Sequence, residues 1–479
     1  MGPSIRYAAI FVIAGIALPA SFPAPVAGQA TEGASDPAAE QTKTQAEQSY
    51  KRGEFDKTVE LANAVLAKNP NDHVALYLRA SARVEQGLQR RDGQLLRDGI
   101  ADAREAIRLG RDNPLYYLPY LYGMTNLAVV ENRKEHADVA VKIADQAIAN
   151  AALKPDQKAN LLYQRGLAKA FLGQTDAAVS DHQEATRLNP ALLAAYTAAA
   201  DTLARAEKTD AANAAFDRTV KAFPESPLVY NNRGEYLRQS NQPEKAVADF
   251  TRAVELDPGY YYAYTNRGFA LMQLDDPQAA ENDFTASLRI NPDQPMVYGL
   301  RGTARVAQRK FEAAIEDHRR ALEKVPNNPL AITDLGFAQF FAGRFEEAVR
   351  SFEKAIELNP NFVQLNPWRV AALAQLGRKE AASTEYAVSF DKPAADRTWN
   401  DNLVAFQYDK INVEQLRAAI AKEEPARTAQ VAEAEYFIGR KLAEQGQDAE
   451  ARAAFQRAID TGAKQLSAYR GAKFALASQ

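Results

Sequence analysis

Residues 230–258 read YNNRGEYLRQSNQPEKAVADFTRAVELDP, and residues 264–292 read YTNRGFALMQLDDPQAAENDFTASLRINP. Both segments carry Tyr, Asn-Arg-Gly, Pro, Ala, Asp-Phe and a final Pro at the same offsets, 34 residues apart. The final proline recurs at this interval along the chain, at Pro190, Pro224, Pro258, Pro292, Pro326 and Pro360. A fixed period of this length indicates that one structural unit is repeated and stacked into an array.

Three further columns keep the same period when the units are taken to start at residues 159, 193, 227, 261, 295, 329 and 363. Position 20 is always alanine, at Ala178, Ala212, Ala246, Ala280, Ala314, Ala348 and Ala382. Position 24 is aromatic or histidine, at His182, Phe216, Phe250, Phe284, His318, Phe352 and Tyr386. Position 8 is usually glycine, at Gly166, Gly234, Gly268, Gly302 and Gly336.

These columns predict a hairpin of two helices. Positions 4, 7, 8 and 11 form one helical stripe, and positions 20, 24 and 27 form another. The small residues at positions 8 and 20 should let two antiparallel helices approach closely, and the aromatic at position 24 is expected to fill the space between units. Pro243 and Pro277 fall where the second helix begins, a position that tolerates a missing N–H. Such a hairpin cannot bury its apolar face alone, so the units must stack.

The repeat resembles the tetratricopeptide repeat (TPR) family. The resemblance implies an all-α fold, a TPR superhelix of helix-turn-helix units with a helical C-terminal cap. It predicts an array over residues 45–389, with strict units from residue 159 and about ten units in the mature chain. Outside the strict block, units are expected at 39–72, at 73–113 with a seven-residue insertion after Gly87, at 114–150 in degenerate form, and at 432–465.

Opposite charges recur in pairs with the repeat. Units with arginine at position 7 have an acid at position 23, and units without that arginine lack the acid as well. We interpret this as an ion pair that fixes the register of the two helices, a structural role rather than a catalytic one. The predicted pairs are Arg165–Asp181, Arg233–Asp249, Arg267–Asp283 and Arg301–Asp317, and Arg79–Asp102 and Arg369–Glu385 follow the same rule.

The N-terminus has the pattern of an export signal. Arg6 precedes a short apolar stretch, which is followed by prolines and small residues. The stretch is short for a membrane-spanning helix, so residues 1–30 are predicted to be a signal peptide, cleaved after Ala27 or Ala30. Residues 31–44 are polar and predict a flexible linker. The mature protein is therefore expected to be periplasmic or secreted, with no stable membrane span.

Composition restricts the partners and the chemistry. The net charge is −3 and no run of Lys and Arg occurs, so nucleic acid is not expected as a partner. The chain has no cysteine, which excludes disulfides, thiolate metal sites and a lipid-bearing cysteine, and fits an oxidising compartment. Of the four histidines, His182 and His318 fall in the aromatic column, where ordinary core packing with satisfied rings is the expected role. No HExxH, GxSxG or P-loop string is present, so we expect no enzyme, cofactor or metal site.

The candidate binding surface is the stripe at positions 2, 5, 6, 9, 12 and 13 of the first helix. The resemblance implies that this stripe faces the inside of the superhelix and takes protein or peptide segments. Amides there could hydrogen-bond an extended backbone, and aromatic or methionine side chains could take apolar groups. The alternative is that these residues contact neighbouring units or solvent. The predicted groove residues are Tyr163, Asn231, Asn232, Tyr262, Thr265, Asn266, Phe269, Met296, Phe337 and Phe341.

The repeat register fails after Tyr386. Residues 390–430 predict a helical connection outside the repeat, and residues 431–479 a last TPR with a C-terminal cap. Trp399, Phe406 and Leu416 are expected to form a small core of the cap. The segments WNDNLVAFQYDKINVEQL and AEAEYFIGRKLAEQGQDAEARAAFQRAID are similar to the tail of NlpI-type TPR lipoproteins of bacterial envelopes. That resemblance implies a non-catalytic adaptor, here without the lipid-bearing cysteine.

The sequence thus predicts an exported scaffold that binds proteins or extended peptides, in a role such as envelope protein turnover or assembly. One alternative is a subunit of an envelope export or polysaccharide-secretion machine. Another is a glycan-binding protein or an unrecognised hydrolase.

Overall fold

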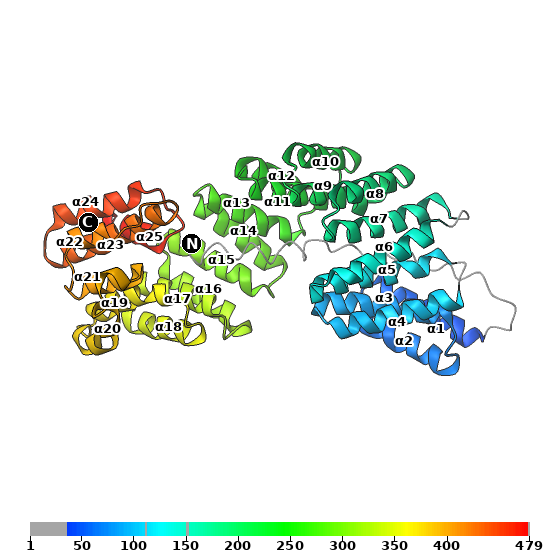
Figure 1. Cartoon of the computed structure of the whole chain (residues 1–479), viewed down its shortest axis with the longest axis horizontal. Coiled ribbons are helices and arrows are strands. Elements are labelled where there is room, and N and C mark those ends of the chain that lie inside the picture. The colour runs from blue at the N-terminus through cyan, green and yellow to red at the C-terminus, as the bar shows by residue number, and fades with distance from the viewer. Residues whose placement is uncertain (1–35, 111–112, 150–152, 478–479) are drawn as a thin grey trace. The chain divides into compact units, whose positions relative to one another are not determined.

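The structure is a computed structural model, and it describes residues 36–110, 113–149 and 153–477. All the regular elements in these ranges are helices, and most of them form antiparallel pairs (Figure 1). The described residues form two compact units, an N-terminal unit that ends at Arg233 and a C-terminal unit that begins at Gly234. The predicted signal peptide, 1–30, lies outside the described residues.

The N-terminal unit is a stack of helical hairpins. Each hairpin packs against the next, and α11 contains the boundary between the two units. The elements are α1 (Pro37–Lys51), α2 (Phe55–Lys68), α3 (His73–Arg90), α4 (Gly93–Leu109), η2 (Pro114–Tyr116), α5 (Tyr117–Glu131), α6 (Lys134–Ile148), α7 (Pro155–Phe171), α8 (Thr175–Leu188), α9 (Leu193–Arg205), α10 (Thr209–Ala222) and α11 (Pro227–Gln239).

The C-terminal unit continues the hairpins and then departs from them. Its repeated pairs are α12 (Pro243–Leu256), α13 (Tyr261–Gln273), α14 (Pro277–Ile290), α15 (Pro295–Ala307), α16 (Phe311–Lys324), α17 (Pro329–Phe341) and α18 (Phe345–Leu358). Shorter elements follow: η3 (Val363–Leu365), α19 (Asn366–Gln375), η4 (Glu380–Ala382), α20 (Ser383–Phe390), η5 (Ala394–Asp396), α21 (Trp399–Gln407) and α22 (Val413–Ala418). The chain ends in α23 (Ala426–Glu444), α24 (Asp448–Asp460) and α25 (Ser467–Leu476).

The glycine and aromatic columns meet inside each hairpin. A Cβ placed on Gly268 would lie 2.6 Å from Cε1 of Phe284, and one on Gly166 would lie 2.4 Å from Cε1 of His182. The residue at position 24 therefore packs its ring on the glycine of its own hairpin, where no side chain fits. The expectation that this ring fills the space between units is corrected: it fills the space between the two helices of one unit.

One predicted boundary also changes, and the insertion after Gly87 takes a definite structure. Residues 37–44, expected in the flexible linker, belong to α1, because Asp36 caps the helix by accepting from the Ala38 N–H and Pro37 occupies the first turn. The insertion after Gly87 does not form a loop. It lengthens both helices of its hairpin, so that α3 and α4 have 18 and 17 residues, and the turn between them contains Arg91.

In the N-terminal unit the first helices of successive hairpins touch one another: α1 contacts α3, α3 contacts α5, α5 contacts α7, and α7 contacts α9. A layer whose members are in direct contact lies on the inside of a curved two-layer stack. We call this layer the inner face of the N-terminal unit. In the C-terminal unit α15 contacts α17 in the same way, and we call the corresponding layer its inner face.

The C-terminal helix returns to the repeats. It packs against α23 and α24 (Figure 1). Phe474 joins a buried cluster with residues of α15, α16 and α17. The Phe474 ring lies 5.2 Å from the ring of Phe341 and 5.5 Å from that of Phe311, centroid to centroid. The α24–α25 connection is held to the turn before α14 by an ion pair of 3.3 Å between Lys464 and Asp275. The chain thus covers part of its own inner face.

The segment after α20 does not form a small core of its own, because its apolar residues join a cluster that extends from α17 to α25. Phe406 and Leu416 are fully buried, and Trp399 packs against the same core while its indole N–H donates to Glu433 at 2.6 Å. None of the helices in the described ranges combines the length and the hydropathy needed to cross a bilayer.

Candidate inner-face binding surface

The structure brings together the members of three of the four predicted ion pairs. In each, Nε and Nη2 of the arginine donate to the two oxygens of the aspartate, and the aspartate is buried. The distances are 2.8 and 2.6 Å for Arg165–Asp181, 2.7 and 2.8 Å for Arg267–Asp283, and 2.9 and 2.8 Å for Arg301–Asp317. Arg79–Asp102 and Arg369–Glu385 also pair.

Arg233 and Asp249 lie in different units, and their pairing stays a prediction. Within the N-terminal unit, Arg233 donates to Asp217 at 2.9 Å.

Each of these arginines also makes a contact that the sequence analysis did not foresee. A guanidinium nitrogen reaches the second helix of the preceding hairpin. Arg267 binds Thr251 at 3.0 Å and Arg301 binds Thr285 at 3.2 Å, both at position 25, and Arg165 binds Asp145 of the degenerate unit at 2.6 Å. The side chain therefore joins two hairpins as well as two helices. A column of polar residues at position 25 was the available signal, although its members share no charge.

Three predicted groove residues are buried inside the hairpins. Tyr163 is 6% exposed, Asn231 is 4% exposed and Thr265 is 4% exposed. All three occupy position 5. The Tyr163 ring packs 5.8 Å from His182, and the Thr265 hydroxyl lies 2.8 Å from that of Ser287, so position 5 faces the second helix of its own hairpin. Their assignment to an open surface is corrected.

A second group of predicted residues is half-exposed and accessible in part. Within the C-terminal unit, the Phe269 ring meets the Phe284 ring edge-on at 6.1 Å and lies under the Arg238 guanidinium at 5.7 Å. Tyr262 lies against Tyr261 at 4.1 Å. This second group consists of five predicted groove residues, all half-exposed: Asn232, Tyr262, Asn266, Phe269 and Met296.

Phe337 and Phe341 are covered by the chain itself. Phe337 meets Trp368 of α19 edge-on at 5.0 Å, and Phe341 meets Phe474 of α25 edge-on at 5.2 Å. Exposed aromatic side chains on one face are a liability in a soluble protein, and here the C-terminal helices remove that liability. These two residues hold an internal segment and are not presented to solvent as an open groove.

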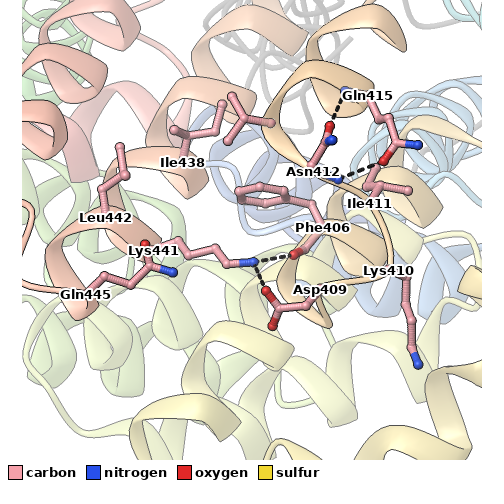
Figure 2. A pocket seen from close by; sticks show the side chains of 11 residues that line it. Phe406, Asp409, Lys410, Ile411, Asn412, Gln415, Ile438, Lys441, Leu442 and Gln445 are labelled. Atoms are coloured by element: carbon pink, nitrogen blue, oxygen red, sulfur yellow. Dashed lines mark hydrogen bonds and ion pairs between the residues drawn. The ribbon is translucent and has the colours of Figure 1, made fainter.

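A cavity of 410 Å³ lies between α21, α22 and α23, in the segment that departs from the repeat (Figure 2). Its floor is apolar, with Phe406, Ile438 and Leu442. Part of its polar rim is paired: the Lys441 ammonium donates to the Phe406 carbonyl at 3.1 Å and to Asp409. Such a cavity can accept an apolar side chain.

Glu85 and Asp201, two carboxylates on the inner face of the N-terminal unit, were missed by the sequence analysis. Burial raises the pKa of Glu85 on α3 to about 7 and that of Asp201 on α9 to about 6. In the C-terminal unit, burial raises the pKa of Asp334 on α17 to about 6, against the opposing effect of Arg470 on α25. Charge alone could not single these residues out, because carboxylates are common on every helix surface of the chain.

The two core histidines are packed as predicted but are not satisfied. His182 is fully buried and neither ring nitrogen has a hydrogen-bond partner, and Nδ1 of the buried His318 also lacks one. Burial lowers the pKa of each to about 4, so both rings are neutral at pH 7. No group of three or more His, Asp or Glu side chains suited to hold a metal ion occurs among the described residues.

Comparison with known proteins identifies the repeats. Family models of the tetratricopeptide repeat match residues 159–192, 197–261, 265–329 and 329–362, which span α7 to α18. No curated protein matches the chain.

Among solved structures, pilF of Pseudomonas aeruginosa is similar over 43% of this chain and 94% of its own, with 20% identity and a TM-score of 0.38. YrrB, described as a TPR protein with an unusual peptide-binding site, is similar over 41% of this chain and 98% of its own, with 21% identity and a TM-score of 0.36. The APC/C hetero-tetramer Cut9–Hcn1 is similar over 88% of this chain and 96% of that chain, with 13% identity and a TM-score of 0.36.

None of these matches bears on the resemblance of the C-terminal part to NlpI-type lipoproteins, which stays a prediction. The family models, the paired helices and the recurring contact between glycine and ring lead to one conclusion. Residues 159–362 are tetratricopeptide repeats, and the described chain is an all-α solenoid of stacked helical hairpins.

Proposed function

We propose that this protein is a non-catalytic scaffold that binds segments of partner proteins on the inner faces of its hairpins, in the periplasm or outside the cell. Tetratricopeptide repeats bind proteins or peptides, which supports the general role. The fold is also generally non-catalytic.

The observation that carries this proposal is the packing of α25 on the inner face of the C-terminal unit. In the C-terminal unit, a ten-residue helix lies on the inner face and is anchored there by Phe474 between Phe311 and Phe341. The chain thus contains an example of a peptide segment received by this face. Its anchor is an aromatic ring in an aromatic seat, the kind of contact that dominates binding energy at protein interfaces.

The part of this inner face that α25 leaves uncovered offers similar chemistry. Tyr262, Asn266 and Phe269 lie on α13, and Met296 begins α15. All four are half-exposed. An amide that both donates and accepts, flanked by aromatic and thioether side chains, suits a peptide backbone with apolar side chains.

The location rests on the N-terminal sequence. A cleaved signal peptide would leave a mature chain that begins at Gly28 or Thr31. We propose a role in the assembly or turnover of envelope proteins, since an exported scaffold without a membrane span meets its partners there. N-terminal sequencing of the protein secreted or released from the periplasm tests this part. An intact Met1 on the mature protein would contradict it.

The binding role is tested by selecting peptides displayed on phage against the full mature chain and titrating the enriched peptides by calorimetry. The double variant Asn266→Ala, Phe269→Ala should lose at least about tenfold in affinity, as expected when an interface anchor is truncated. The control is Val388→Ala on α20, a residue that is 69% exposed and far from the inner stripe in sequence, and it should bind as the wild type does. Failure to enrich any peptide, or equal binding by both variants, would overturn the proposal.

A further inference from the structure

Two carboxylates lie on the inner face of the N-terminal unit. Glu85 of α3 has Tyr50 of α1 and Tyr122 of α5 as its electrostatic neighbours, and Asp201 of α9 lies near Tyr163 of α7. All these neighbours belong to first helices of adjacent hairpins. Glu85 and Asp201 therefore face the layer of first helices and not the outer surface formed by the second helices.

Neither carboxylate has a partner of the kind that buried acids have elsewhere in the array. Within the described ranges, no ion pair or hydrogen bond involves Glu85 or Asp201, although both are half-buried. The cation that lowers the pKa of Asp201 is Arg205, which lies one turn later on the same helix and is exposed. By contrast, Asp181 and Asp317 are each held by an arginine through both carboxylate oxygens. An unpaired acid in a desolvated position costs stability, which a bound cation would restore.

An independent observation on the same layer also points to a missing donor. Gln164 of α7 is 7% exposed, and its Oε1 is buried without a hydrogen-bond partner. Gln164 stands between α3 and α9 in the order of first helices. Three acceptors on one face, two of them acidic, thus lack donors. Buried acceptors are normally paired, so each of the three is a candidate contact for a ligand that carries N–H groups.

In the C-terminal unit a covering segment brings a positive charge into range of such an acid. The charge of Arg470 on α25 acts on Asp334, on the inner stripe of α17, and opposes part of the effect of burial on the Asp334 pKa. The segment that covers this inner face therefore places an arginine within electrostatic range of a half-buried carboxylate and a phenylalanine between two aromatic rings. The inner face of the N-terminal unit carries the same kind of carboxylate, and no described segment within that unit brings it a cation.

We propose that the inner face of the N-terminal unit binds a basic segment of a partner protein, with one Arg or Lys on Glu85 and a second on Asp201. This inference rests on the proposed function and adds the chemistry of the partner. Between the two cations the backbone of the segment passes Gln164, whose amide can turn its unpaired oxygen from the buried position toward one of the N–H groups of the segment.

The fold also sets the spacing of the two cations. From α3 to α9 there are three steps between neighbouring first helices, α3–α5, α5–α7 and α7–α9. Helices in contact lie roughly 8–10 Å apart, so the two acids are separated by roughly 24–30 Å along the face. An extended chain advances about 3.3 Å per residue, which places the two basic residues about seven to nine positions apart.

The test uses labelled peptides of alternating Ala and Ser, about fourteen residues long, with two arginines about eight positions apart. Binding to the full mature chain is followed by fluorescence anisotropy at low ionic strength. Glu85→Gln and Asp201→Asn keep the shape of each side chain and should each weaken binding by about tenfold or more, the value of one charge-assisted hydrogen bond. The matched controls are Glu60→Gln on α2 and Asp176→Asn on α8, both exposed and each paired with a lysine, and they should leave binding unchanged.

Two further peptides sharpen the result. A peptide with glutamates in place of the arginines should not bind. A peptide with two adjacent arginines can reach only one of the two acids, so only one of the variants Glu85→Gln and Asp201→Asn should weaken its binding. The inference is overturned if the arginine peptide does not bind, if the glutamate peptide binds equally well, or if Glu85→Gln and Asp201→Asn bind like the wild type. Should displayed peptides still bind through Asn266 and Phe269 in that case, the proposed function would stand and only this inference would fall.

Discussion

Replacing His182 with phenylalanine should stabilise the protein and remove part of its sensitivity to acid. His182 is fully buried, and both ring nitrogens lack partners. Phenylalanine occupies the same position in other hairpins, where Phe284 packs on Gly268 as His182 packs on Gly166. The substitution therefore keeps the shape of the site and removes polar atoms that lose their hydrogen bonds to water on folding. At pH 7 we expect a gain of roughly 1–3 kcal/mol in the free energy of unfolding.

The dependence on pH follows from the lowered pKa. In the folded protein the pKa of His182 is about 4, against an ordinary value of 6.5. The unfolded chain therefore binds more protons between these values, and stability falls as the pH falls through this window. One such histidine lowers the free energy of unfolding by about 2 kcal/mol between neutral pH and about pH 5. The His182→Phe variant should therefore not show this fall in the free energy of unfolding between neutral pH and about pH 5.

The assay is urea unfolding of the full chain near neutral pH and near pH 5, followed by circular dichroism. His318→Phe should behave like His182→Phe, because burial lowers the pKa of His318 in the same way. The reverse substitution, Phe284→His, should destabilise the protein and introduce a new loss of stability in acid. If His182→Phe and the wild type lost the same stability between the two pH values, the account of an unsatisfied neutral imidazole would be wrong.

Three other substitutions test separate features of the fold. Asp283→Ala should cost about 2 kcal/mol, since it leaves the Arg267 guanidinium without its main partner, and replacing Arg267 as well should recover part of the loss; a double-mutant cycle with no coupling energy would contradict the pairing. Glu207 has a φ of 56° in the turn between α9 and α10, so Glu207→Gly should raise the free energy of unfolding by about 1 kcal/mol, and an unchanged or lower urea midpoint would count against backbone strain there. Phe474→Ala should cost about 3 kcal/mol and raise the fluorescence of a hydrophobic dye by uncovering Phe341; unchanged dye binding would argue that α25 does not cover the inner face.

Most of the architecture could be predicted because it depends on the spacing of residues that are close in the sequence. A glycine at position 8 and a ring at position 24 are separated by less than one hairpin, and the contact between Gly268 and Phe284 follows from two helices joined by a short turn. The arginine–aspartate pairs were predictable for the same reason. Helix periodicity specifies which side chains share a face, and the two helices of one hairpin have a fixed register.

The candidate site was predicted less well, because accessibility depends on packing between elements. Periodicity placed Tyr163 and Thr265 on the inner stripe, but it does not say how far a side chain leans toward the neighbouring helix, and position 5 is buried. The return of α25 to Phe341 joins segments that are distant in the chain, and no repeat spacing encodes it. Glu85 and Asp201 look like any helical carboxylate in the sequence, and only the helices around them reveal that they lack partners.

The arginine at position 7 has a consequence for how this protein can change in length. Arg301 contacts Thr285 in the preceding hairpin, and Arg267 contacts Thr251 one hairpin earlier. Deletion of residues 261–294 would remove one whole repeat and bring Arg301 to Thr251, a threonine in place of a threonine. The contact between the position-7 arginine and the position-25 threonine is thus the same at both places. Whole repeats can therefore be gained or lost by recombination without leaving this arginine opposite an unsuitable side chain.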